Sequence, residues 1–164
     1  MNHLATSKED ILAASRDLIK ENGWAAVSIR AVASRCSVSA GTIYNYYESK
    51  ADLLSDTIES IWHEIFFHPE DEQIFHDVES CISWIYERLE YGNRQFPGFF
   101  SLHSFGFMRD EKTSGKKRMM KTWGHILNGL CEVLGNDPKV RADVFDQEFT
   151  EKKFADILFS LILV

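Results

Sequence analysis

The residues best suited to chemistry lie between positions 39 and 50, where hydroxyl, amide and ammonium groups stand close together. Thr42, Tyr44, Asn45 and Tyr46 fall within about two turns of an expected short helix, and Lys50 follows it. A helix packed only for stability would not distribute this many hydroxyl and aromatic groups around its circumference. A helix lying in a DNA groove would, because phosphates and base edges require hydrogen-bond donors on several sides.

Two short helices and a tight turn are expected to position these groups. Ser28 can cap the first helix, and Ser39 can cap the second, over residues 40–47. Residues 36–38 form the turn between them. Ser49 can cap a third, longer helix that begins directly after it.

A helix before this pair completes a small head. Ser7 opens it with a capping-box-like sequence, and Gly23 stands where a left-handed C-cap is favoured. Its apolar stripe has helical spacing. The expected head core is Leu18, Trp24, Val27, Ile29, Val32, Ile43 and Tyr47.

Residues 37–54, SVSAGTIYNYYESKADLL, resemble the helix-turn-helix signature of the TetR/AcrR family of bacterial transcription repressors. The chain departs from the family pattern at Ser37, where Gly is usual, and at Tyr47, where Phe is usual. The resemblance is specific over residues 7–54. The family's residues are present in register at Val38, Ser39, Gly41, Thr42, Ile43, Tyr44, Tyr46 and Lys50.

The resemblance implies that Thr42, Tyr44 and Tyr46 lie against the sugar-phosphate backbone of DNA. The alternative that the two tyrosines only pack within the head remains open. Asn45 is the candidate for base reading, because its amide can pair bidentately with adenine. Residues at helix starts offer charge and backbone N–H groups to phosphate. The predicted DNA-contacting set is Ser28, Ser39, Ala40, Gly41, Thr42, Tyr44, Asn45, Tyr46 and Lys50.

Two members of that set are chosen for their small side chains. Gly41 allows the helix to approach a base edge closely, and Ala40 can touch a thymine methyl group.

The net charge of −7 argues against a nucleic-acid binder, but its distribution weakens this objection. Residues 1–50 hold six Lys/Arg against five Asp/Glu, whereas the remainder is strongly acidic. An acidic body with a near-neutral head can bind DNA only if its cations gather on one face. The affinity should then depend strongly on salt.

His63 and His68 suggest a metal site, but their spacing does not support one. Two zinc ligands on a helix require positions i and i+4, whereas these residues are five apart and so about 140° apart around the axis. The sequence shows no Ser-His-Asp or Cys-His arrangement and no glycine-rich phosphate loop. We therefore expect no metal, no cofactor and no enzymatic activity.

The chain is expected to be all-α, with a three-helix DNA-binding head over residues 1–48 and a larger helical ligand-binding and dimerisation body over residues 49–164. A long helix from Lys50 connects the two. The further body helices are expected at 71–91, 97–109 and 113–134, followed by one that starts at Asp137 and breaks near Gln147.

Aromatic residues in the body are interrupted by small polar groups, notably between Phe99 and Phe107. A cavity lined by rings with a few polar anchors suits a small apolar or aromatic effector. The resemblance implies such a pocket in the body. The predicted lining residues are Trp62, Trp84, Arg88, Phe100, His103, Phe107 and Trp123.

The C-terminal helix is apolar on more than one side, which favours burial on several faces. We expect that the chain stops inside this helix and that a further helix or a partner subunit covers it. The resemblance implies a dimer interface there, and a core helix in a monomer is the alternative. The predicted interface residues are Phe154, Ile157, Leu158, Leu161 and Ile162.

The N-terminus lacks the apolar core of a signal peptide, and no apolar run approaches the roughly 20 residues of a membrane span. Three cysteines stand far apart without ligand-like spacing. This usage indicates reduced thiols and a cytoplasmic location, away from membranes.

Together these features predict a homodimeric, ligand-responsive repressor that reads two half-sites of a palindromic operator about 34–36 Å apart. Effector binding in the body would release the DNA. Two other classes remain possible: a helical enzyme or small-molecule carrier, and a helical interaction module without DNA binding.

Overall fold

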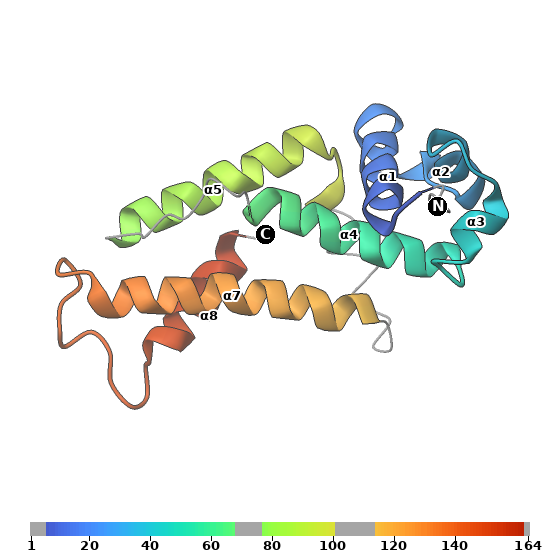
Figure 1. The fold of residues 1–164 in the computed structure, drawn as a ribbon. Helices are drawn as coiled ribbons and strands as arrows, with labels where there is room; N and C mark the ends of the chain where they lie inside the picture. The colour runs from blue at the N-terminus through green and yellow to red at the C-terminus, as the bar shows by residue number, and fades with distance from the viewer. Residues whose placement is uncertain (1–5, 68–76, 101–113, 163–164) are drawn as a thin grey trace.

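The computed structural model describes residues 6–67, 77–100 and 114–162, with the backbone alone for 114–122 and 162. The elements in these ranges are helices, so the predicted all-α class is confirmed (Figure 1). They are α1 (Lys8–Asn22), the 3₁₀ turn η1 (Trp24–Ala26), α2 (Ile29–Arg35), α3 (Ala40–Tyr44), α4 (Lys50–Phe66), α5 (Val78–Gln95), α7 (Ser114–Asn136) and α8 (Glu151–Ile162).

Helices α1, α2 and α3 gather at one end of the molecule, and α4 runs from them into the body (Figure 1). The predicted capping box is present at the start of α1: the Asp10 amide donates to Ser7 Oγ at 3.1 Å, and the Ser7 amide donates to Asp10 Oδ2 at 2.9 Å. Gly23 ends the helix with φ of 77°. The predicted bounds of α1 are therefore confirmed.

The predicted core residues of the head are buried except for Trp24, and Ile11 and Ile19 of α1 are fully buried as well. Ile29, Val32, Ile43 and Tyr47 are all buried. Trp24 is half-buried, and its ring stacks on Phe99 with 5.8 Å between the ring centroids. It therefore joins the head to the segment that follows α5, which the local pattern did not indicate.

The second helix of the pair is shorter than predicted, because α3 ends at Tyr44 and not at Tyr47. The amides of Tyr46 and Tyr47 both donate to the carbonyl oxygen of Ile43, at 2.9 and 3.0 Å, and this closes the helix. Before α3, Ser37 adopts φ of 57°. This is the left-handed conformation that glycine adopts at lower cost, as the departure from the family pattern implied.

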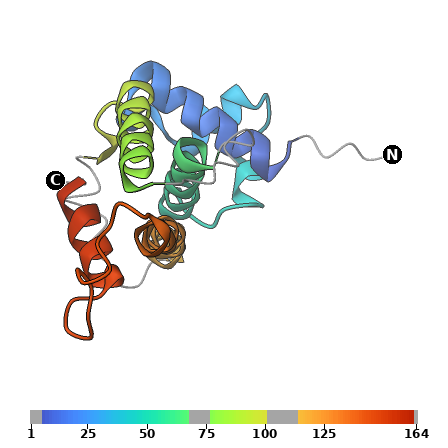
Figure 2. The same ribbon diagram turned by 90° about the vertical axis from the view of Figure 1, so that its left-hand side faces the viewer.

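In the body, α4, α5 and α7 pack against one another and α8 packs on α7 (Figure 2). The observed bounds of α4 and α7 agree with prediction within two residues, whereas α5 begins at Val78 and ends at Gln95 instead of spanning 71–91. Gly92 allows α5 to approach α4 closely, since a Cβ there would lie 2.6 Å from Ile65 Cδ1. The expected helix at 97–109 lies largely outside the described residues.

The prediction of a helix that starts at Asp137 is wrong, because no helix forms between α7 and α8. The Asp137 carboxylate is occupied elsewhere: Oδ2 accepts from the Val78 amide and Oδ1 from the Lys139 amide, both at 2.8 Å. The residue thus ties the start of α5 to the end of α7. Within the described ranges, none of the helices combines the length and the apolar composition that a membrane span requires.

Candidate functional site

Helix α3 presents one face to solvent and the opposite face to the head core. Gly41, Tyr44 and Asn45 are exposed and share a face through their i, i+3 and i+4 spacing. Ile43 is fully buried on the other side. The Tyr44 side chain is 54% exposed, so its ring does not contribute to the head core. An outside partner can therefore reach the amide of Asn45, the phenol of Tyr44 and the exposed backbone at Gly41.

Serine hydroxyls at the helix starts serve as caps. Ser28 Oγ accepts from the Ala31 amide at 3.1 Å, and Ser39 Oγ accepts from the Thr42 amide at 3.2 Å. Ser39 Oγ also lies 3.1 Å from Thr42 Oγ1. The Ser28 hydroxyl makes its bond as an acceptor, and its proton is therefore available to an outside oxygen.

Tyr46 is not placed like Tyr44. Its hydroxyl donates to the carbonyl oxygen of Thr6 at 2.7 Å, and the residue is half-buried. The bond holds the segment before α1 against the end of α3. The single phenolic proton is thus used within the head. Sequence reasoning missed this role, since the two partners lie 40 positions apart.

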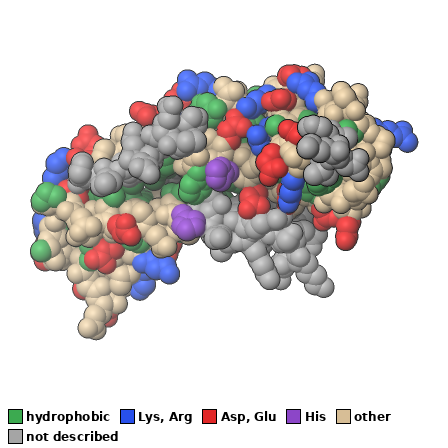
Figure 3. Space-filling model, in the orientation of Figure 1, with side chains coloured by type: hydrophobic (Ala, Val, Ile, Leu, Met, Phe, Trp, Pro, Cys, Tyr) green, Lys and Arg blue, Asp and Glu red, His purple; other side chains and the backbone are tan. Residues whose placement is uncertain are grey.

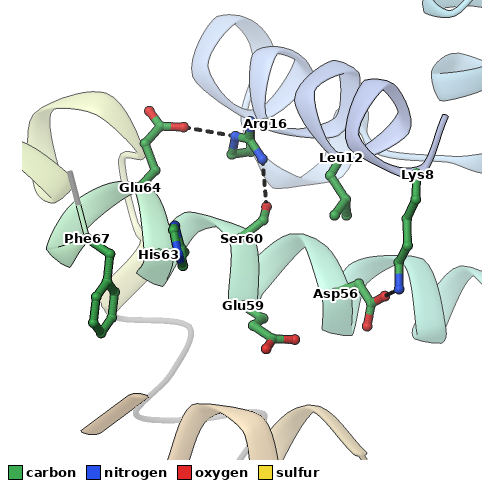
Figure 4. Close-up of a pocket in the computed structure, with 9 residues that line it drawn as sticks. All are labelled: Lys8, Leu12, Arg16, Asp56, Glu59, Ser60, His63, Glu64 and Phe67. Atoms are coloured by element: carbon green, nitrogen blue, oxygen red, sulfur yellow. Dashed lines mark hydrogen bonds and ion pairs between the residues drawn. The ribbon is translucent and has the colours of Figure 1, made fainter. Parts of the chain in front are cut away.

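A cleft of about 480 Å³ separates α1 from α4 (Figure 4). Ion pairs cross it: Lys8 Nζ lies 2.6 Å from Asp56 Oδ2, and Arg16 Nε lies 2.8 Å from Glu64 Oε2. Because these opposite charges neutralise one another, the ion pairs connect α1 of the head to α4 across the cleft. Its lining residues are Lys8, Leu12, Arg16, Asp56, Glu59, Ser60, His63, Glu64 and Phe67.

A smaller cavity of about 140 Å³ lies between α4, α5 and α7. Of the predicted effector-binding residues, Trp84 lines it. Burial raises the pKa of the Cys81 thiol to about 11, so this part of the wall is uncharged at neutral pH. The lining residues are Phe66, Phe67, Cys81, Trp84, Ile85, His125, Ile126, Gly129 and Leu130.

Other members of the predicted effector set lie in the aromatic core. Trp62 is 1% exposed, and its ring centroid lies 5.7 Å from those of both Phe100 and Trp123. The Arg88 guanidinium lies 5.5 Å from the centroid of the Tyr91 ring. His103 and Phe107 lie outside the described residues.

Residues 11–57 match the family model of the tetR family of bacterial regulatory proteins. The chain carries a TetR-family DNA-binding head. This confirms the resemblance drawn from residues 37–54. The matching model describes regulatory proteins, and this agrees with the expectation of no enzymatic activity.

Curated relatives match the same TetR-family head. The regulator UidR of Escherichia coli K12 is 38% identical over 48 residues, which are 29% of this chain and 24% of UidR. The repressor KstR of Rhodococcus jostii RHA1 is 45% identical over 47 residues, which are 29% of this chain and 22% of KstR. The matched segment therefore spans about a quarter of each relative.

Solved structures extend the similarity of fold to the body. A transcriptional regulator from Rhodococcus sp. Rha1 has a TM-score of 0.68 at 20% identity, covering 96% of this chain and 80% of that one. FadR from Bacillus subtilis, solved with stearoyl-CoA, has a TM-score of 0.61 at 20% identity, covering 95% of this chain and 83% of that one. The similarity of fold to these two structures therefore covers both the TetR-family head and the helical body behind it.

Helix α8 divides the predicted dimer residues between two faces. Phe154 and Leu158 are half-buried and pack inward, whereas Ile157 is 48% and Leu161 68% exposed. The side chain of Ile162 lies outside the described residues. Behind the TetR-family head, the body therefore keeps an exposed apolar pair one helical turn apart.

No group of three His, Cys, Asp or Glu side chains within the described ranges is arranged to hold a metal ion. His68 of the pair considered above lies outside those ranges.

Proposed function

We propose that this protein is a cytoplasmic transcription repressor that binds a palindromic operator as a homodimer and is released by a small apolar or aromatic effector. The observation that carries the proposal is the exposed face of α3 within a TetR-family head. Gly41, Tyr44 and Asn45 are exposed on that face and do not pack against the head core. The amide and the phenol can form hydrogen bonds with base edges and phosphates.

Each group of the α3 face has a distinct task in this proposal. Asn45 reads a base through its amide, and Tyr44 donates to a phosphate oxygen. Gly41 allows close approach, because a Cβ there would meet only Ser39 Oγ, at 3.6 Å. The position is thus open on its outer side, which a neighbouring DNA backbone or base can occupy.

The effector is proposed to enter between α4, α5 and α7. The cavity of about 140 Å³ is smaller than the ~300–1,000 Å³ of a typical ligand site, so the effector must displace its walls. Phe66 and Phe67 of that wall terminate α4, which begins at Lys50 on the DNA side. Displacement at one end of α4 therefore changes the position of the head at the other.

The class of effector follows from the wall, which is largely aromatic and aliphatic. FadR from Bacillus subtilis, which shares this fold, was solved with stearoyl-CoA. A long acyl chain is accordingly one candidate among the apolar effectors proposed for this protein.

Dimerisation is proposed through α8. Ile157 and Leu161 expose apolar surface on the side of α8 that faces away from α7. A second copy that covers this pair would remove it from water and hold two heads at a fixed separation.

The proposal is tested by binding the full chain to DNA flanking its own gene, against a scrambled duplex of equal length. We expect preferential binding to one flanking segment, lost when an apolar effector such as stearoyl-CoA is added. Equal binding to both duplexes by an intact dimer would contradict a repressor.

A further inference from the structure

Most of the positive charge of residues 1–50 is neutralised by carboxylates of the protein itself. Residues 1–50 contain six Lys/Arg, and four of them bind carboxylates of the protein itself. On the face shown in Figure 3, basic and acidic side chains are correspondingly interspersed over the head. The self-neutralised cations are Lys8, Arg16, Lys20 and Arg35.

Three of these cations, all on α1, bind carboxylates of α4. Lys8 Nζ lies 2.6 Å from Asp56, whose side chain is only 8% exposed. Arg16 and Lys20 share the two oxygens of Glu64, at 2.8 and 2.6 Å. Because the carboxylates are largely buried, moving these cations to a phosphate would leave negative charge inside the protein without a partner.

The fourth cation, Arg35 on α2, forms a two-pronged pair with Glu21. Its Nη1 lies 2.7 Å from Glu21 Oε2, and its Nη2 binds the other oxygen. The guanidinium lowers the pKa of Glu21. The positive charge of Arg35 is therefore already neutralised by Glu21 and is not available to a DNA phosphate.

Arg30 and Lys50 differ from these four. Both side chains are exposed, and neither has an ion-pair or hydrogen-bond partner in the part of the chain that the structure describes. Arg30 lies on the outer side of α2, since Ile29, Val32 and Ala33 fill the inner side. Lys50 is the first residue of α4. Helix α3 lies at the edge of the molecule between α2 and the start of α4 (Figure 1).

We propose that Arg30 and Lys50 are the two cations of residues 1–50 that neutralise DNA phosphates in each copy of the protein, on either side of α3. Arg30 is thus a DNA-contacting residue beyond the set predicted from the sequence. The inference rests on the proposed DNA-binding function and adds which charges perform it.

The two-cation head has a measurable signature in the salt dependence of binding. Each neutralised phosphate contributes ~0.9 to the slope of log K against log salt. Two heads with two free cations each predict a slope of about −3.6, whereas engagement of all six cations per head predicts about −11. The expected salt dependence is therefore weaker than engagement of all six cations would produce, and this narrows the strong dependence expected from the sequence.

The test measures equilibrium binding of the full chain to its flanking DNA and to the scrambled duplex, between about 50 and 200 mM salt. The variants are Arg30→Gln and Lys50→Gln, with Arg35→Gln and Lys20→Gln as controls of matched charge. Circular dichroism and unfolding curves confirm that each variant is folded.

We expect Arg30→Gln and Lys50→Gln each to reduce the slope by about 1.8 for two heads, on both duplexes, while the controls keep the wild-type slope. An unchanged slope for Arg30→Gln, or an equal reduction for Arg35→Gln, would overturn the inference. Equal binding to both duplexes with the expected slope changes would instead contradict the repressor and leave the charge assignment supported.

Discussion

Arg16 on α1 and Glu64 on α4 form an ion pair in which Nε lies 2.8 Å from Oε2, and this pair fastens the head to the helix that enters the body (Figure 4). The same guanidinium donates to Ser60 Oγ at 3.0 Å. The other oxygen of Glu64 lies 2.6 Å from Lys20 Nζ, and the Tyr91 hydroxyl of α5 donates to it at 3.4 Å. One carboxylate thus connects three helices.

Glu64→Gln should destabilise the protein, because two cations lose their shared counter-charge in a junction that is about one-fifth exposed. We expect the free energy of unfolding to fall by about 1.5–3 kcal/mol. Urea unfolding measures this change. The exposed pair Glu90–Arg94 is the control, since Glu90→Gln should change stability by less than about 1 kcal/mol.

The same substitution should also weaken operator binding, since α1 then constrains the head less firmly on α4. Fluorescence anisotropy with the flanking DNA measures the affinity under conditions where the variant is folded. Wild-type affinity in a destabilised Glu64→Gln variant would show that the pair supports stability alone.

Gly41→Ala should separate folding from DNA binding. A Cβ at this position meets only Ser39 Oγ at 3.6 Å, and alanine favours the helix by about 1 kcal/mol over glycine, so the variant should be at least as stable as wild type. On the DNA the methyl group would occupy the space of close approach, and we expect affinity to fall about tenfold or more, a cost of roughly 1.4 kcal/mol. Gly124→Ala on α7 is the control and should bind DNA normally.

Gly129→Leu should fill the cavity between α4, α5 and α7. Gly129 lines that cavity, and a Cβ there meets no atom within 4 Å. Gly124 is equally open but does not line it, so Gly124→Leu is the matched control for the gain in helix propensity. We expect Gly129→Leu to exceed the control in stability by roughly 1–2 kcal/mol, from the added apolar burial.

The cavity-filled variant should also bind operator DNA yet resist release by an apolar ligand such as stearoyl-CoA. Anisotropy with and without ligand tests this expectation. Normal release of Gly129→Leu would place the effector elsewhere in the body.

Leu161→Glu should disrupt the dimer, because a charge would enter the apolar surface that a second copy is proposed to cover. Val144, also exposed at 40% but in the loop before α8, provides the control Val144→Glu. We expect Leu161→Glu to weaken self-association at least tenfold, or about 1.4 kcal/mol, in analytical ultracentrifugation. A dimer of unchanged affinity would rule out this face of α8.

Asp77 should contribute to the acid sensitivity of the protein. The Ser80 hydroxyl and amide and the Lys139 ammonium lower its pKa well below the ordinary value of 3.8. A carboxyl whose pKa is depressed in the folded state stabilises the protein fully above its unfolded pKa, and this contribution is lost as pH falls through the folded pKa. Asp77→Asn should therefore lose less stability than wild type below pH 3.8.

Unfolding curves measured at successive pH values test this difference. Lys139→Met removes one of the three causes, and its loss of stability should lie between those of wild type and Asp77→Asn. Parallel curves for wild type and Asp77→Asn would show that other carboxyls govern the acid response.

Much of the fold was predictable because it depends on interactions within one helical turn. The Ser7–Asp10 capping box, the stop at Gly23 and the cap at Ser49 all join residues at most four positions apart. The buried face of α4 likewise follows from its helical periodicity. Such patterns determine where helices begin, end and turn their apolar sides.

The tertiary structure decided which distant groups meet. Asp137 was expected to cap a new helix, but folding brings it to the start of α5, where it binds the Val78 amide. Tyr46 carries the family's motif, yet its hydroxyl is used by Thr6. In each case a side chain could satisfy either a local or a distant partner, and only packing chooses between them.

The place of the helix-turn-helix in the chain was therefore determined by the sequence itself, because the caps at Ser28 and Ser39 depend on residues three positions away. Its electrostatics were not. The six cations of residues 1–50 are equivalent in the sequence, and only the packing of α1 on α4 and of α2 on α1 separates the four that are neutralised from Arg30 and Lys50. Charges are paired by distance in space, which the order of residues does not specify.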